Sequence, residues 1–89
     1  MMIQNSPLKL GKNFRLQWEK SQDKYVLLYA EGMVELNGSA AEVLLLCDGN
    51  RTPGDIITTL EEKFTEDDLD DDVNNFIQEA LDKGWVQYC

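Results

Sequence analysis

The chain has 89 residues, of which 43% are hydrophobic, so it is long enough for one domain with a single two-layer core. Its net charge is −9, and residues 37–89 hold thirteen of the seventeen acidic residues but only three of the eight basic ones. This distribution argues against binding to nucleic acids or anionic membrane surfaces, because Lys and Arg side chains hold those ligands.

The sequence contains no targeting or metal-binding signal. No segment approaches the ~20 apolar residues that a membrane span needs, and the N-terminal stretch MMIQNSPLKLGKNF lacks the apolar region of a signal peptide. We therefore expect a cytoplasmic protein. Cys47 and Cys89 are too few for a disulfide framework or a zinc site, and we expect Cys47 to be a buried free thiol on a helix face.

The first third of the chain predicts a flexible arm followed by strands. Residues 1–12 have no periodicity, so we expect an N-terminal arm there and a single domain over residues 13–89. The segment 14–19 alternates apolar and polar residues, which indicates a strand with Phe14, Leu16 and Trp18 inward. The apolar run 25–29 indicates a central strand, and a turn at Glu31-Gly32 leads into a short strand over 33–36.

The rest of the chain predicts three helices. Asn37 is a good N-cap for the first, whose apolar face includes Cys47, and Asp48-Gly49 is expected to end it. Thr52-Pro53-Gly54-Asp55 has the pattern of a capping box that opens the second helix. The inner stripe expected for that helix is Ile56, Ile57, Leu60 and Phe64. A third helix is expected to begin within the acidic run 65–72 and to end at Gly84, followed by an extended tail over 85–88.

These elements together predict an α+β, winged-helix-like domain, in which a three-stranded antiparallel meander is followed by three helices. The chain contains no histidine, which removes the Ser-His-Asp and Cys-His nucleophilic systems. No Gly-rich phosphate loop is visible, and the acidic runs look uniformly solvated. We therefore expect a non-catalytic protein that needs no cofactor and no metal.

Because the sequence shows no catalytic group, the candidate site is a binding surface. Residues 33–36 form the last strand of the meander, and an edge strand offers unpaired amides and carbonyls to an incoming peptide. The third helix could form the opposite wall of a groove. The alternatives are a solvated helix face beside a protected edge, a DNA-binding winged helix, which the acidic third helix disfavours, and a dimerisation domain.

Several short motifs carry a resemblance to a known family. They are Arg15-Leu16-Gln17-Trp18-Glu19, the run from Leu27 to Asn37, Ser39-Ala40-Ala41-Glu42, Cys47-Asp48-Gly49, Asp72-Val73 with Phe76, and Gly84-Trp85-Val86. In this order and spacing the chain resembles the PqqD family over nearly its whole length. Ala30 stands where the family form would have Pro.

The resemblance implies a peptide chaperone of pyrroloquinoline quinone (PQQ) biosynthesis. Such a protein binds the ribosomal precursor peptide PqqA by strand addition and presents it to the radical S-adenosylmethionine enzyme PqqE. A recognition element for a different ribosomal peptide is the alternative, and we expect a monomer or a weak homodimer. Carried onto this sequence, the implied peptide-binding residues are Met33, Val34, Glu35 and Leu36 on the strand and Asp72, Asn75, Phe76, Glu79 and Lys83 on the helix.

Overall fold

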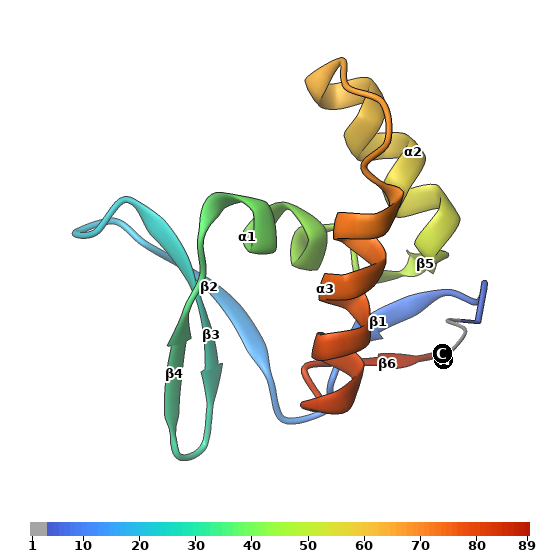
Figure 1. Ribbon diagram of the computed structural model, residues 1–89. Helices are drawn as coiled ribbons and strands as arrows, with labels where there is room; N and C mark the ends of the chain where they lie inside the picture. Colours follow the sequence, from blue (N-terminus) through green and yellow to red (C-terminus); the bar gives the residue numbers. More distant parts are fainter. Residues whose placement is uncertain (1–3) are drawn as a thin grey trace.

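Two antiparallel three-stranded sheets and three helices make up the computed structural model, which describes residues 4–89 (Figure 1). In chain order the elements are β1 (Leu8–Leu10), β2 (Arg15–Glu19), β3 (Lys24–Tyr29), β4 (Gly32–Glu35), α1 (Gly38–Leu45), β5 (Asp48–Arg51), α2 (Pro53–Phe64), α3 (Asp70–Asp82) and β6 (Val86–Tyr88). The predicted α+β class, with a meander followed by three helices, is confirmed.

Strands β2, β3 and β4 form the predicted meander, with β3 in the middle. In the register of the sheet, Leu27 of β3 lies opposite Leu16 of β2 and Val34 of β4. Ala30 and Glu31 form the turn between β3 and β4, so the chain reverses one residue earlier than the sequence suggests. Because β4 pairs with β3 alone among the described strands, it is an edge strand of this sheet.

The end of β2 departs from the predicted inward alternation. Phe14 and Leu16 are half-buried, as expected, but the Trp18 side chain is 47% exposed. Trp18 packs edge-on against Tyr25 of β3, with ring centroids 5.0 Å apart. The hairpin between β2 and β3 projects away from the helices (Figure 1), so the sheet face that carries Trp18 has little of the core above it there.

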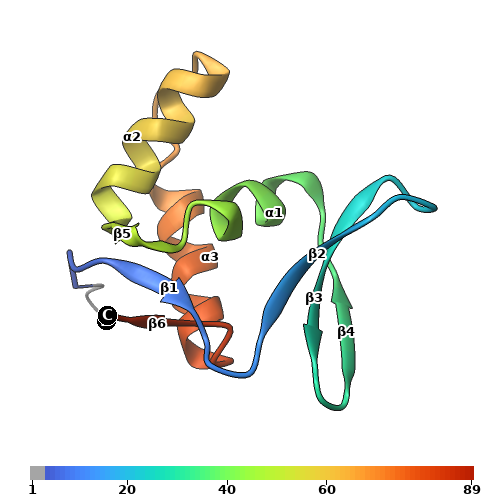
Figure 2. The same cartoon turned by 180° about the vertical axis from the view of Figure 1, so that it is seen from behind.

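Residues 8–10 form a strand and not part of a flexible arm, which corrects the prediction for residues 1–12. Strand β1 lies between β5 and β6, and Leu8 is completely buried. Pairing with the C-terminal strand β6 orders this segment. Leu8 pairs with Tyr88, and the Gly11 N–H donates to the Trp85 carbonyl at 2.7 Å. Figure 2 shows β1 and β6 side by side. Residues 1–3 of the predicted arm lie outside the described residues.

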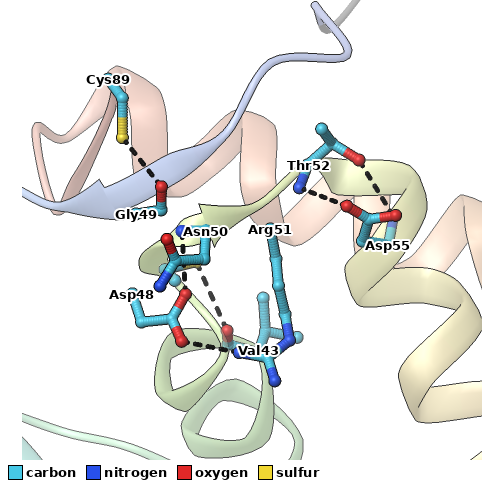
Figure 3. Close-up of polar contacts among 9 residues, drawn as sticks. Val43, Asp48, Gly49, Asn50, Arg51, Thr52, Asp55 and Cys89 are labelled. Atoms are coloured by element: carbon cyan, nitrogen blue, oxygen red, sulfur yellow. Dashed lines mark hydrogen bonds and ion pairs between the residues drawn. The ribbon is translucent and has the colours of Figure 1, made fainter.

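A short strand, β5, replaces the turn expected between the first two helices. Helix α1 ends at Leu45 with Leu46 as its C-cap, so Gly49 does not take the predicted position after a helix end. Gly49 instead lies within β5 with φ +91°, a conformation that favours glycine. The Asp48 carboxylate accepts a hydrogen bond from the Asn50 amide and pairs with Arg51 at 2.7 Å (Figure 3). These two interactions stabilise the backbone conformation of β5.

The predicted helix starts are confirmed. The Asn37 side chain accepts a hydrogen bond from the Ala40 amide at 2.7 Å. Thr52 and Asp55 form a reciprocal capping box, with Pro53 at the first helical position of α2 (Figure 3). Helix α3 begins at Asp70 inside the acidic run, where carboxylates favour the positive end of the helix dipole. Within residues 4–89, no helix is both long and apolar enough to cross a bilayer.

The core lies where the helices pack together with strands of both sheets. Its fully buried large side chains are Leu8, Leu27, Leu44, Ile56, Ile77 and Val86. Cys47 is a buried free thiol, as predicted. Phe64 is not part of the inner stripe of α2, because its side chain is 48% exposed in the last turn of that helix. The position of Phe64 matters for the site described next.

Candidate functional site

A groove of about 820 Å³ lies between the edge strand β4 and helix α3, and we call it the β4–α3 groove. The start of α1 and the end of α2 complete its walls. Its lining residues are Val34, Glu35, Leu36, Asn37, Gly38, Ser39, Ala40, Glu42, Val43, Leu60, Phe64, Glu66, Leu69, Asp72, Val73, Phe76, Glu79 and Trp85. The volume falls within the range of ordinary ligand pockets, ~300–1,000 Å³.

Apolar side chains form the interior of the β4–α3 groove. Leu36, Leu60 and Val73 are buried in the core and form the bottom of the groove, while Val34 is half-buried on β4. Two half-buried aromatic residues stand together on the α3 side, where the ring centroids of Phe76 and Trp85 are 6.3 Å apart. The exposed Phe64 ring lies along the α2 wall. Apolar side chains of a partner can therefore be buried against both walls.

The open edge of β4 presents specific backbone groups. The Leu36 amide donates to the Tyr25 carbonyl at 3.3 Å, so Leu36 is bonded inward to β3. Bonded and non-bonded pairs alternate along an antiparallel ladder, which gives Val34 and Gly32 the same inward orientation. Met33 and Glu35, opposite Leu28 and Val26, are the non-bonded pairs. Their amide and carbonyl groups therefore point toward the open edge.

The structure brings most, but not all, of the predicted site residues into the groove. Those that line it are Val34, Glu35, Leu36, Asp72, Phe76 and Glu79. Asp72, Phe76 and Glu79 are spaced i, i+4 and i+7 on α3, so they share one face of the helix. The predicted association of the strand with one face of the third helix thus exists in the fold. Peptide contact by these residues stays a prediction.

Three predicted site residues do not line the groove. The Met33 side chain is 53% exposed and points to the sheet face opposite that of Val34, since side chains alternate along a strand. Asn75 is exposed on α3 outside the groove lining. Lys83 lies at the C-cap of α3, where its ammonium pairs with Glu79 at 2.9 Å and stands 4.9 Å from the centre of the Trp85 ring. Lys83 therefore interacts with two residues that line the groove without lining it itself.

Sequence reasoning missed several groove residues outside the strand and the helix. The sequence predicts Trp85 only as part of an extended tail, and it predicts Phe64 in the inner stripe of the second helix. Phe64 is the last residue of α2 and Trp85 lies three residues after the end of α3, and an aromatic residue close after an amphipathic helix is the one sequence signal that singles them out. Glu66 belongs to the acidic connection between α2 and α3, which has no periodicity to interpret, whereas Leu69 precedes Val73 by four residues and fits the apolar stripe expected for the third helix.

The charged residues that line the groove are all acidic, and three of them have a lysine beside them. Glu42 pairs with Lys63 at 2.7 Å and Glu79 with Lys83 at 2.9 Å, while Glu35 lies 3.5 Å from Lys24. Glu66 and Asp72 have no ion-pair partner among the described residues. No Lys or Arg of the described chain lines the groove. The groove is therefore apolar inside and negative at its rim.

Neither a metal-binding cluster nor a thiol lies in the groove lining of the described residues. Within residues 4–89, no three His, Cys, Asp or Glu side chains are placed to hold a metal ion. The pKa of the Cys47 thiol is raised to about 12, mainly by burial and to a smaller extent by the nearby Asp48 carboxylate. Cys47 is outside the groove lining, and such a thiol stays protonated and unreactive at neutral pH.

Comparisons with known proteins agree with one another. The family model described as "Coenzyme PQQ synthesis protein D (PqqD)" matches residues 24–86. A protein of Methylococcus capsulatus named "PqqA binding protein" is 42% identical over 80 residues, which cover 90% of this chain and 86% of that protein. A protein of the same name from Klebsiella pneumoniae is 43% identical over 86 residues, which cover 96% and 94% of the two chains.

A solved structure is similar over the same length. It is the solution NMR structure of the PqqD truncation of Methylobacterium extorquens PqqCD, described as a functional, stand-alone recognition element for ribosomally synthesised and post-translationally modified peptides. The TM-score is 0.74 at 26% sequence identity, and the match covers 90% of this chain and 87% of the other.

Proposed function

The chain belongs to the PqqD family, and on that premise we propose that it binds the precursor peptide PqqA in the biosynthesis of coenzyme PQQ, with the β4–α3 groove as the binding site. The observation that carries the proposal is the coincidence of an open strand edge with an apolar groove of about 820 Å³ beside it. The relatives named for PqqA binding supply the identity of the peptide.

The mechanism is strand addition at the open edge of β4. The backbone groups of Met33 and Glu35 pair with the peptide and restrict its register to steps of two residues, because only alternate residues of an antiparallel strand bond to one neighbour. Alternate peptide side chains then enter the β4–α3 groove and contact Val34, Phe76 and Trp85. Ordering a flexible peptide costs ~2–5 kcal/mol, so the apolar anchors must contribute more than this.

The role that we assign is that of a non-catalytic accessory protein in the cytoplasm. A peptide held as an edge strand keeps the residues on either side of the bound segment free, so a modifying enzyme can act on them. We assign that enzyme to the radical S-adenosylmethionine class, as PqqE, which the family resemblance implies as the partner. The cross-linking chemistry would then belong to the partner, while this chain supplies the peptide in a fixed conformation.

A calorimetric titration tests the proposed function. The full chain is titrated with synthetic PqqA and, separately, with a peptide of the same composition in scrambled order. We expect saturable binding of PqqA at one site per chain and no heat from the scrambled peptide. Equal heats from both peptides, or none from either, would remove PqqA recognition and leave only the fold.

A further inference from the structure

The rim of the β4–α3 groove carries carboxylates that the fold leaves without a cation. Five acidic residues line the groove, namely Glu35, Glu42, Glu66, Asp72 and Glu79. Three of them have a lysine within ion-pair distance, at 2.7 to 3.5 Å. Glu66 and Asp72 have no such partner among the described residues, and both are exposed. Their negative charge is available to whatever occupies the groove.

The two unpaired carboxylates lie at one end of the groove. Glu66 follows the C-cap of α2, and Asp72 is in the first turn of α3, with Leu69 of the groove lining between them in sequence. Asp70 and Asp71 share that first turn. The helix dipole offers only ~+0.5 charge at its N-terminus, so it cannot neutralise three carboxylates. This end of the groove therefore keeps a negative potential.

The opposite end differs in charge. Glu79 lies two turns further along α3, about 10 Å from Asp72 at 1.5 Å per residue. Its carboxylate is held by Lys83, whose ammonium also stands over the Trp85 ring. The Phe76–Trp85 pair beside it makes this end apolar and close to neutral. The groove thus has an aromatic end and an anionic end within the length of a short extended segment.

We propose that the β4–α3 groove selects a peptide segment with a Lys or Arg side chain at the end formed by Glu66 and Asp72 and an apolar side chain at the end formed by Phe76 and Trp85. The proposal rests on the proposed function and deepens it, because it names the chemistry that the peptide must carry. An acidic segment is rejected, since no Lys or Arg of the described chain lines the groove to meet it.

The spacing sets the distance between the two peptide side chains. Along α3, Phe76 lies ~6 Å and Glu79 ~10 Å from Asp72. Consecutive side chains on one face of an extended strand are ~6.6 Å apart, so the two ends of the groove are one or two such steps apart. The basic and the apolar residue are then two to four residues apart in the peptide and on the same face. A segment of this length is also matched by the two outward positions of β4, Met33 and Glu35.

The test compares two doubly substituted variants of the full chain that lose the same charge. In the first, Glu66→Gln and Asp72→Asn neutralise the groove carboxylates. In the second, Glu62→Gln and Asp23→Asn neutralise exposed carboxylates that neither line the groove nor belong to the first turn of α3. Thermal melts establish that both are folded, as expected for surface substitutions. The affinity for synthetic PqqA is then measured at about 50 mM and about 500 mM salt, where ions screen exposed charges differently.

At low salt we expect the groove variant to bind PqqA about three- to tenfold more weakly than the matched control, since each exposed ion pair contributes modestly. Added salt should weaken binding by the unsubstituted chain and change little for the groove variant. Equal affinities and equal salt dependences of the two variants would overturn the charge selection while leaving PqqA binding intact. Failure of the unsubstituted chain to bind PqqA would instead overturn the proposed function together with this inference.

Discussion

At the scale of single residues, Cys47 shows how position decides chemistry. Cys47 is 4% exposed, and its thiol donates a hydrogen bond to the Val43 carbonyl at 3.4 Å. Burial, and then the Asp48 carboxylate, raises the pKa of Cys47 to about 12, against an ordinary value of 9.0. Cys89, in contrast, is exposed at the end of β6. The two thiols should therefore differ strongly in reactivity and in their effect on stability.

Cys47 should make the folded state less stable at alkaline pH. Above pH 9 the unfolded chain loses the thiol proton while the folded chain retains it, so the free energy of unfolding falls as the pH rises toward 12. At pH 10 this contribution is about 1.4 kcal/mol. Replacing Cys47 with Val removes the titration and keeps a buried apolar side chain. Denaturant unfolding from pH 8 to 10 should show a smaller loss of stability for the variant, and equal losses would contradict the assignment.

Phe76 is predicted to be the main aromatic anchor for the peptide. It lines the β4–α3 groove from α3 and packs beside Trp85, so Phe76→Ala removes apolar contact area from both. We expect PqqA affinity to fall about tenfold, as for anchor residues at other interfaces. Leu81→Ala is the matched control, because Leu81 is also half-buried on α3 but lies outside the groove lining. Equal affinities of the two variants would rule out Phe76 as an anchor.

At the scale of elements, β4 is the edge strand that lines the groove, and the backbone groups on its outer side remain unpaired. The ladder with β3 uses the inward groups of Val34 and Leu36 and leaves those of Met33 and Glu35 unpaired. Proline at an outward position removes a peptide contact, whereas proline at an inward position removes a bond of the sheet itself. Single substitutions on β4 can therefore separate binding from folding.

Glu35→Pro should abolish most PqqA binding while the meander stays folded. The substitution removes one outward amide and brings a ring to the edge, so we expect an affinity loss of at least about tenfold. Glu35→Ala is the control, because it removes the carboxylate and its contact with Lys24 but keeps the amide. Val34→Pro should instead destabilise the sheet. Titration calorimetry with thermal melts distinguishes these cases, and unchanged affinity of a folded Glu35→Pro chain would rule out strand addition at β4.

The sequence predicts elements that carry their own local signal. The meander follows from alternation and turn residues, α2 from its capping box, and α3 from its apolar stripe. Strands β1 and β5 have only the sequences LKL and DGNR, which show no alternation long enough to read. They exist because β1 pairs with β5 and β6 from distant parts of the chain. Pairing across such distances has no local signature.

The site was predictable to the level of one strand and one helix, and not to the level of each side chain. Asp72, Phe76 and Glu79 follow from helical spacing once the helix face is known. Met33 required the sheet register, since its side chain and its backbone edge point in different directions. Phe64 and Trp18 have the periodicity of buried residues, but the fold places no layer over them.

At the scale of the whole molecule, the two ends of the chain close one sheet. The first strand, β1, lies beside the last, β6, and the Cys89 amide donates to the Pro7 carbonyl at 3.0 Å. This sheet supports α3, while α1 connects the helices to the meander (Figure 2). The walls of the β4–α3 groove thus belong to two parts of the fold whose relative position depends on the core between them.

Leu8 is predicted to be essential to this closure. Its side chain is completely buried in the core, so Leu8→Ala leaves a cavity and should lower the free energy of unfolding by about 2–5 kcal/mol. Lys9→Ala is the control in the same strand, because Lys9 is exposed and should change stability by less than about 0.5 kcal/mol. Chemical denaturation checks both. Equal stabilities of the Leu8→Ala and Lys9→Ala variants would contradict the packing of Leu8 in the core and would support a flexible arm over residues 8–10.

Site-resolved amide hydrogen exchange, with and without PqqA, tests strand addition most directly. In the free protein the Val34 and Leu36 amides should be protected by β3, while those of Met33 and Glu35 exchange fast. At saturation with PqqA we predict strong protection of the Met33 and Glu35 amides, with little change at Val34 and Leu36. Fast exchange at Met33 and Glu35 in the saturated complex would contradict the account, because the peptide would then be held elsewhere on the protein.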